Sequence, residues 1–141
     1  MTNTLNGIAT VSFYAADHAA AKAWYTELLG MPPYFDMPGY FEFRIGDYEH
    51  ELGIIDGSYA PGGAVAAVGG AIVFWQVDDL EATLARLLEL GATEYEPVTV
   101  RGDGFVTASV VDPFGNLLGI MTNVHYEHIR ALRGSTSGPA L

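Results

Sequence analysis

Residues 13–30, FYAADHAAAKAWYTELLG, and residues 74–91, FWQVDDLEATLARLLELG, follow one pattern. Each stretch starts with aromatic residues, passes through an aspartate and ends in a glycine 13 residues after it: Asp17 precedes Gly30, and Asp78 precedes Gly91. Further along, each copy reaches a Leu-Gly-Ile triplet, at 52–54 and at 118–120. Such self-similarity predicts two copies of one supersecondary unit.

The first copy predicts a strand, a helix and further strands. Branched and aromatic residues favour a strand at 8–14. Asp17 is a good helix N-cap, alanine-rich residues 19–25 favour a helix, and Gly30 is a typical C-terminal stop. The strands that follow are expected at residues 40–45 and 51–55.

The second copy repeats this order. Asp78 is the expected N-cap, with Glu81 completing a capping box, and Gly91 is the expected stop. Strands are expected at residues 71–77, 105–111 and 117–121, and residues 93–100 should form one strand or two short ones around Pro97. A half of this kind leaves one sheet face bare, so we expect the two copies to pack together or the chain to dimerise.

We expect one domain at residues 1–126, followed by a tail. It consists of a first module at about 7–56, a linker at 57–70 that is rich in glycine and alanine, and a second module at about 71–122. In the tail, 127–141, we expect at most one helical turn after His125 and disorder over the Gly- and Ser-rich residues 133–139.

The composition is that of an acidic globular protein. Apolar residues make up 50% and charged residues 16%, with 6 Lys and Arg against 17 Asp and Glu, for a net charge of −11. This charge argues against nucleic acid and against an anionic membrane surface as partners. The chain has no cysteine, so thiolate sites and disulfides are excluded. Because the first residues lack a signal-peptide pattern, we expect a cytoplasmic protein.

The order FYAAD, AWYTELLGM, VDDLEATLARLLELGA and DPFGNLLGI resembles the vicinal oxygen chelate superfamily, over about residues 7 to 122. That superfamily includes glyoxalase I, bleomycin-resistance proteins, extradiol dioxygenases, fosfomycin-resistance enzymes and methylmalonyl-CoA epimerase. The resemblance implies an α+β fold, in which two tandem βαβββ modules form a curved mixed sheet around a cleft. It also implies a homodimer and a small-molecule ligand in the concave face.

In the metal-dependent members, ligands such as His, Gln and Glu come from the first and last strand of each module. Counting back from the expected helix caps gives the two first-strand positions. One is Thr10, seven residues before Asp17, and the other is Ile72, six residues before Asp78. The resemblance therefore places a hydroxyl and an aliphatic side chain where the metal enzymes have donors.

The last-strand positions fall at Gly53 and at Gly119, the latter seven residues after Asp112. A slip of two residues would put Glu51 in place of Gly53. A divalent-metal site needs several strong donors, and Thr, Gly, Ile and Gly offer one hydroxyl. We therefore expect no metal and no other cofactor, and no catalytic residue can be named.

Strand alternation gives the expected lining of the cleft, because every second side chain shares a face. The expected ligand-binding residues are Thr10, Ser12, Tyr14, Arg44, Gly53, Ile55, Ile72, Phe74, Gln76, Leu117, Gly119 and Met121. Arg44 is included because it shares a strand face with Tyr40 and Glu42 and could hold a carboxylate; the alternative is an exposed face. The other open alternative is that these side chains fill the space as core.

The four histidines do not suggest a metal site. His18 follows the helix cap and is expected to be solvated, and His50 faces the opposite side of its strand from the next residue. His125 and His128, with Glu127 between them, leave open an accidental surface site.

Three functional hypotheses remain. The first is a metal-independent protein that binds or sequesters a small organic ligand, an antibiotic or a metabolite. The second is a glyoxalase-, dioxygenase- or epimerase-like enzyme with rearranged metal ligands. The third is a non-catalytic dimeric scaffold whose cleft is filled.

Overall fold

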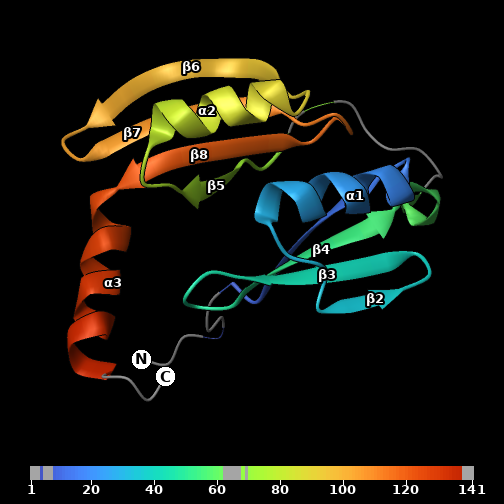
Figure 1. The fold of residues 1–141 in the computed structure, drawn as a ribbon, viewed down its shortest axis with the longest axis horizontal. Helices are drawn as coiled ribbons and strands as arrows, with labels where there is room; N and C mark the ends of the chain where they lie inside the picture. The colour runs from blue at the N-terminus through green and yellow to red at the C-terminus, as the bar shows by residue number, and fades with distance from the viewer. Residues whose placement is uncertain (1–3, 5–7, 62–67, 69, 138–141) are drawn as a thin grey trace. The chain divides into compact units, whose positions relative to one another are not determined.

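The structure, a computed structural model, describes residues 4, 8–61, 68 and 70–137 (Figure 1). The chain divides into two compact units. The first contains Met1–Ala67 and Phe114–Asn116, and the second contains Val68–Pro113 and Leu117–Leu141. Half of the expected linker, residues 62–67 and 69, lies outside the described residues, while its start, Gly57–Tyr59, is the short 3-10 helix η1.

The first unit is a βαβββ module. Its elements are β1 (Thr10–Ala15), α1 (His18–Leu29), β2 (Phe35–Met37), β3 (Tyr40–Ile45) and β4 (His50–Asp56). The strand order is β1-β4-β3-β2, with β1 and β4 parallel and the other pairs antiparallel.

The second unit has the same topology. Its elements are β5 (Val73–Gln76), α2 (Leu80–Glu89), β6 (Thr93–Gly102), β7 (Phe105–Val111), β8 (Leu117–Asn123) and α3 (Val124–Ser137). The strand order is β5-β8-β7-β6, and β5 and β8 are parallel. The α+β class and the two βαβββ modules are therefore confirmed, each module forming its own four-stranded mixed sheet.

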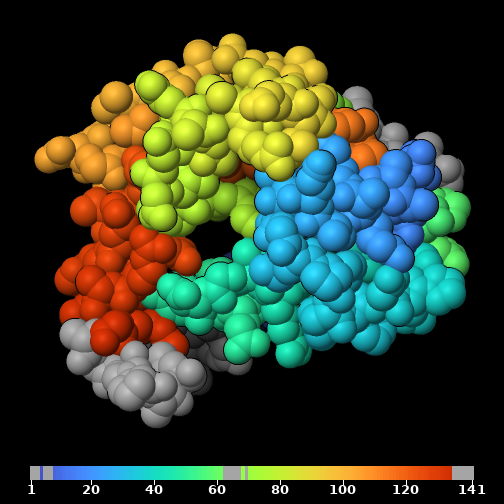
Figure 2. Space-filling model, viewed as in Figure 1, coloured from blue at the N-terminus to red at the C-terminus, as the bar shows by residue number. Residues whose placement is uncertain are grey.

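Each unit has a core between its helix and one face of its sheet. In the first unit, Tyr25 on α1 and Phe41, Phe43 and Ile54 on the sheet are at most 1% exposed. In the second unit the core residues include Leu80, Leu87, Ala108, Val110, Leu118 and Ile120. Figure 2 shows the side chains of α2 in front of the second sheet. Each sheet thus has a helix-covered face and a helix-free face.

Two expectations about single elements were wrong, those for β2 and for α3. Strand β2 was missed because Phe35–Met37 is only three residues long and begins two residues after Pro33. Of the two alternatives left open at Pro97, the single strand is correct: β6 continues through Pro97, which is tolerated because β6 is an edge strand with register shifts at this point. Helix α3 continues to Ser137, well beyond one turn, and only 138–139 of the stretch expected to be disordered lie outside the described residues.

The N-cap of α2 also differs from the expectation. The Asp79 side chain, not that of Asp78, accepts a hydrogen bond from the backbone N–H of Ala82 at 3.0 Å. Asp17 makes the matching bond at the start of α1, as expected. Ile72 stands seven residues before Asp79, as Thr10 stands seven before Asp17.

Replacing Asp79 by alanine is expected to lower the free energy of unfolding by about 1 kcal/mol, because the first turn of α2 loses its cap. Asp78→Ala is the matched control and should change it by less than about 0.5 kcal/mol, since Asp78 is 90% exposed and its ion pair with Arg130, at 3.6 Å, is a surface pair. Urea denaturation followed by circular dichroism measures both. A larger loss in Asp78→Ala would restore the original assignment of the cap.

Within residues 4, 8–61, 68 and 70–137, no helix has the length and apolarity needed to cross a membrane.

Candidate ligand-binding faces of the two sheets

The strand registers put most of the predicted site residues on the helix-free faces. In the first unit, Thr10 pairs with Glu51, Ser12 with Gly53 and Tyr14 with Ile55, so these side chains share one face, together with Arg44. In the second unit the same holds for Phe74, Gln76, Leu117, Gly119 and Met121. Ile72 lies one residue before β5 and is half-buried.

An aromatic ring lies over the glycine of the last strand in each unit. A Cβ atom added at Gly53 would lie 2.7 Å from Cε1 and 2.8 Å from Cζ of Tyr40. A Cβ atom at Gly119 would lie 2.5 Å from Cδ1 and 2.7 Å from Cε1 of Phe74. A side chain at either position would therefore displace the ring above it.

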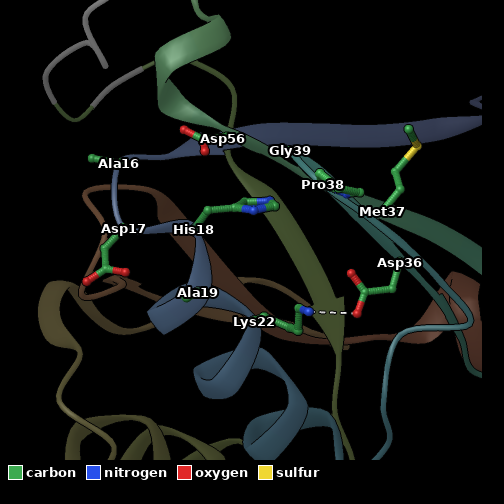
Figure 3. A pocket seen from close by; sticks show the side chains of 10 residues that line it. All are labelled: Ala16, Asp17, His18, Ala19, Lys22, Asp36, Met37, Pro38, Gly39 and Asp56. Atoms are coloured by element: carbon green, nitrogen blue, oxygen red, sulfur yellow. Dashed lines mark hydrogen bonds and ion pairs between the residues drawn. The ribbon is translucent and has the colours of Figure 1, made fainter.

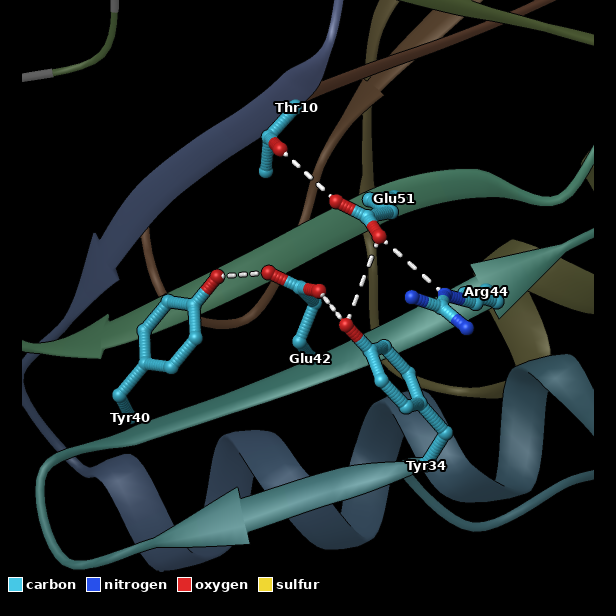
Figure 4. Close-up of polar contacts among 6 residues, drawn as sticks. All are labelled: Thr10, Tyr34, Tyr40, Glu42, Arg44 and Glu51. Atoms are coloured by element: carbon cyan, nitrogen blue, oxygen red, sulfur yellow. Dashed lines mark hydrogen bonds and ion pairs between the residues drawn. The ribbon is translucent and has the colours of Figure 1, made fainter.

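A polar network follows β3 and β4 of the first unit; we call it the Glu42 network (Figure 4). It consists of Thr10, Tyr34, Tyr40, Glu42, Arg44 and Glu51. The hydroxyls of Tyr34 and Tyr40 donate to different oxygens of the Glu42 carboxylate. Glu42 is only 8% exposed. The network thus holds a buried carboxylate on the helix-free face.

Glu51 occupies the rim of this network. Its carboxylate accepts from the Thr10 hydroxyl at 3.1 Å and from Nε of Arg44 at 3.1 Å, and the Tyr34 hydroxyl lies 3.4 Å away. The hydrogen bond from Thr10 and then that from Arg44 lower the pKa of Glu51. The Arg44 guanidinium lies over the Tyr34 ring, 4.1 Å from its centroid.

Burial, and then the hydrogen bond to Glu42, raise the pKa of Tyr40 to about 12 from 10.0. When the pKa of a tyrosine is higher in the folded than in the unfolded protein, the protonated hydroxyl stabilises the fold. This stabilisation is complete at pH values below the pKa of the unfolded state, and it is lost as the pH rises from about 10 to 12. We expect this loss of stability to be about 1–2 kcal/mol. It is smaller than the free energy that corresponds to the whole pKa shift, because Tyr40 is partly exposed and solvent screens the interaction.

The measurement is the free energy of unfolding in urea at pH 9 to 11.5, together with ¹³Cζ-tyrosine NMR for the titration itself. The variant Tyr40→Phe should lose most of the decline with pH. Tyr95→Phe is the matched control, since Tyr95 is 51% exposed. An equally steep decline in Tyr40→Phe would show that the fold does not depend on the protonated hydroxyl.

The second unit has a smaller polar group on its helix-free face. Ser109 donates to Oε1 of Glu96 at 3.1 Å, and Arg101 bonds Oε2 of Glu96 at 3.2 Å and the Thr107 hydroxyl at 3.1 Å. Ser109 is fully buried and Thr107 is 7% exposed. Glu96 is thus a carboxylate with a basic partner.

Sequence reasoning missed the central residues of both groups. Strand alternation had placed Glu42 beside Arg44, so a buried carboxylate there could have been considered. Tyr34 precedes β2 in a loop, and no sequence pattern pointed to it. Arg101 and Glu96 are brought together by the irregular register of β6, which periodicity does not show.

A hollow of about 980 Å³ lies beside α1, away from these faces (Figure 3). It is lined by Ala16, Asp17, His18, Ala19, Lys22, Asp36, Met37, Pro38, Gly39 and Asp56. Its polar groups already serve the local structure: Asp17 and Asp56 cap helices, and Lys22 pairs with Asp36 at 2.6 Å. His18, expected to be solvated, is half-buried, with Nε2 2.8 Å from the Ile54 carbonyl oxygen. We assign no ligand to this hollow.

Nowhere in the described part of the chain do three or more His, Asp or Glu side chains form a group that could hold a metal ion. His125, Glu127 and His128 on α3 therefore make no such site. The four positions at which the sequence suggested family metal donors carry a Thr, an Ile and two glycines covered by rings, and they do not fit a divalent ion.

No curated protein matches the sequence significantly. A glyoxalase-related enzyme from Fulvimarina pelagi is 21% identical, with TM-score 0.68, covering 85% of this chain and 90% of that one. Lactoylglutathione lyase from Agrobacterium tumefaciens is 22% identical, with TM-score 0.63, and the match covers 84% of this chain and 95% of that one. A bleomycin resistance determinant encoded on transposon Tn5 is 23% identical, with TM-score 0.60, and the match covers 84% of this chain and 98% of that one.

These structural matches show a shared fold. The family model that matches covers residues 7–120, which is most of the chain. The chain belongs to the Glyoxalase/Bleomycin resistance protein/Dioxygenase superfamily.

Proposed function

We propose that this protein binds a small organic ligand on the helix-free faces of its two sheets, without a metal ion. The observation that carries the proposal is the ring over each last-strand glycine, Tyr40 over Gly53 and Phe74 over Gly119. At these positions a metal-dependent relative would need a donor side chain. Here an aromatic surface takes the donor's place.

The chemistry of the faces supports an organic ligand. Phe74, Tyr34, Phe35 and Met37 are 40–50% exposed although they are large and apolar or aromatic. The helix-free face of the first unit also has hydrogen-bonding groups, including the Ser12 and Thr10 hydroxyls, both on exposed residues. Apolar surface with a few fixed polar groups is the usual lining of a small-molecule site.

Further parts of the proposal rest on the sequence and on the family. In them the protein is a homodimer, and it acts in the cytoplasm on an antibiotic or a metabolite.

The test combines elemental analysis of untagged protein with a thermal-shift screen of antibiotics and aromatic metabolites, run with and without Ni²⁺, Zn²⁺ and Fe²⁺. We expect substoichiometric metal and a ligand-induced stabilisation that does not depend on added metal. A ligand at 100 times its Kd stabilises the fold by about 2.7 kcal/mol. One metal ion per chain, or stabilisation only with added metal, would contradict the proposal and favour an enzyme.

Two variants locate the binding face. Ser12→Trp places a bulky ring on the helix-free face next to Gly53 and should abolish the ligand-induced shift. Ala85→Trp is the matched control, since Ala85 is exposed on α2, and should leave the shift unchanged. If no compound shifts either protein, the scaffold hypothesis gains instead.

A further inference from the structure

Glu42 is a buried carboxylate that no basic side chain in the described part of the chain neutralises by an ion pair. It is 8% exposed and receives hydrogen bonds from two tyrosine hydroxyls, which are neutral donors. The ion pairs of the described residues, such as Lys22–Asp36 and Arg44–Glu51, do not include Glu42. Burying a carboxylate charge is strongly unfavourable unless it is paired, so a positive charge bound next to Glu42 would stabilise this site.

Glu51 and Glu96, the other carboxylates in the polar groups of the two faces, differ from Glu42 in that each forms an ion pair. In the second unit the residue opposite the last-strand glycine is the neutral Ser109, as Glu42 is opposite Gly53 in the first. The nearest carboxylate there, Glu96, is paired with Arg101. On the first face, Glu51 likewise has Arg44 as its partner. Duplication thus supplies an internal comparison in which the other carboxylates on these faces have a counter-ion.

The first face also shows how it holds a planar cation. The Arg44 guanidinium stacks over the Tyr34 ring while its Nε donates to a carboxylate. Phe35 pairs directly with Glu42 across β2 and β3, and its ring is 44% exposed. An aromatic ring and a carboxylate therefore stand side by side a second time, and no cation–π contact or ion pair seen among the described residues involves Phe35 or Glu42.

We propose that Glu42 is the counter-ion for a ligand carrying a planar organic cation, an amidinium or guanidinium group, which stacks on Phe35. The proposal rests on the proposed function and names the charge class of its ligand. The Tyr34 hydroxyl lies within 3.4 Å of Glu51, so it can shift its hydrogen bond from Glu42 to Glu51 as the cation arrives. Figure 4 shows this hydroxyl between the two carboxylates.

The experiment titrates the full chain with three probes of nearly one shape: benzamidine, which is cationic, benzamide, which is neutral, and benzoate, which is anionic. Binding is followed by ¹⁵N–¹H NMR. We expect saturable binding of benzamidine and at least about tenfold weaker binding of the other two. Glu42→Gln should weaken benzamidine binding by at least about tenfold. Glu89→Gln is the matched control, since Glu89 is exposed on α2 and lies outside the helix-free faces, and it should weaken binding by less than about twofold.

A second variant keeps the test valid if Glu42→Gln fails to fold. Phe35→Ala removes an exposed ring, should leave the melting temperature unchanged and should weaken benzamidine binding by about three- to tenfold. The proposal is overturned if benzamide binds as well as benzamidine, if neither variant changes binding, or if benzamidine does not bind at about 10 mM. If neutral compounds bind and Glu42→Gln does not weaken that binding, this inference is overturned and the proposed function stands. If no compound of the thermal-shift screen binds, the proposed function fails as well.

Discussion

Replacing Phe41 by alanine is expected to lower the free energy of unfolding of the first unit by about 3–5 kcal/mol. Phe41 is fully buried, and its ring lies 4.7 Å from that of His18 and 5.7 Å from that of Phe43. The truncation leaves a cavity beneath α1 and removes the ring on which His18 packs. Because a domain is stabilised by only about 5–15 kcal/mol, the loss takes up a large part of the total.

Each unit contains one of the two tryptophans, Trp24 in the first and Trp75 in the second, so the units can be followed separately. In Trp75→Phe the remaining Trp24 reports on the first unit, and in Trp24→Phe the remaining Trp75 reports on the second. Urea denaturation of these two proteins, each with and without Phe41→Ala, and followed by tryptophan fluorescence, measures the loss of stability in each unit. Phe74→Ala is the matched control: its ring is 40% exposed, and it should cost less than about 1.5 kcal/mol. A similar loss for both variants would contradict the assignment of Phe41 to the core.

The modules were predictable because their signals are local. The N-cap at Asp17, the stop at Gly30 and the alternation of β3 each depend on a few neighbouring residues. The cap of α2 was misplaced because Asp78 and Asp79 are adjacent and both suit the role chemically. Only the backbone shows which of them accepts the hydrogen bond from Ala82.

The candidate site was less predictable, because its main residues are defined by contacts between strands. Alternation placed Thr10, Ser12 and Arg44 on a common face, as the registers now show. That Glu42 is buried depends on the tyrosines that cover it, and one of them, Tyr34, comes from a loop. The sequence likewise shows a glycine at 53 and 119 but not the ring that requires it.

Replacing Gly119 by alanine is expected to lower the free energy of unfolding by about 1–3 kcal/mol, because the new Cβ atom would lie 2.5 Å from Cδ1 of Phe74. Phe74 pairs with Gly119 between parallel strands, so the ring cannot move away without leaving the face of the sheet. In the Phe74→Ala background the cost should vanish or turn into a gain of about 0.5 kcal/mol, since alanine restricts the unfolded chain more than glycine does.

The four proteins of this double-mutant cycle, measured by urea denaturation, give a coupling energy between the two positions. A large coupling means that the ring and a side chain at 119 compete for one volume. A metal donor at 119 would then require the loss of Phe74, so the aromatic surface and a metal site are alternatives at that point of the fold. A coupling near zero would mean that the ring leaves freely, and the glycine would no longer argue against a donor. The same test at Gly53 is stricter, because the hydrogen bond from Tyr40 to Glu42 holds its ring in place.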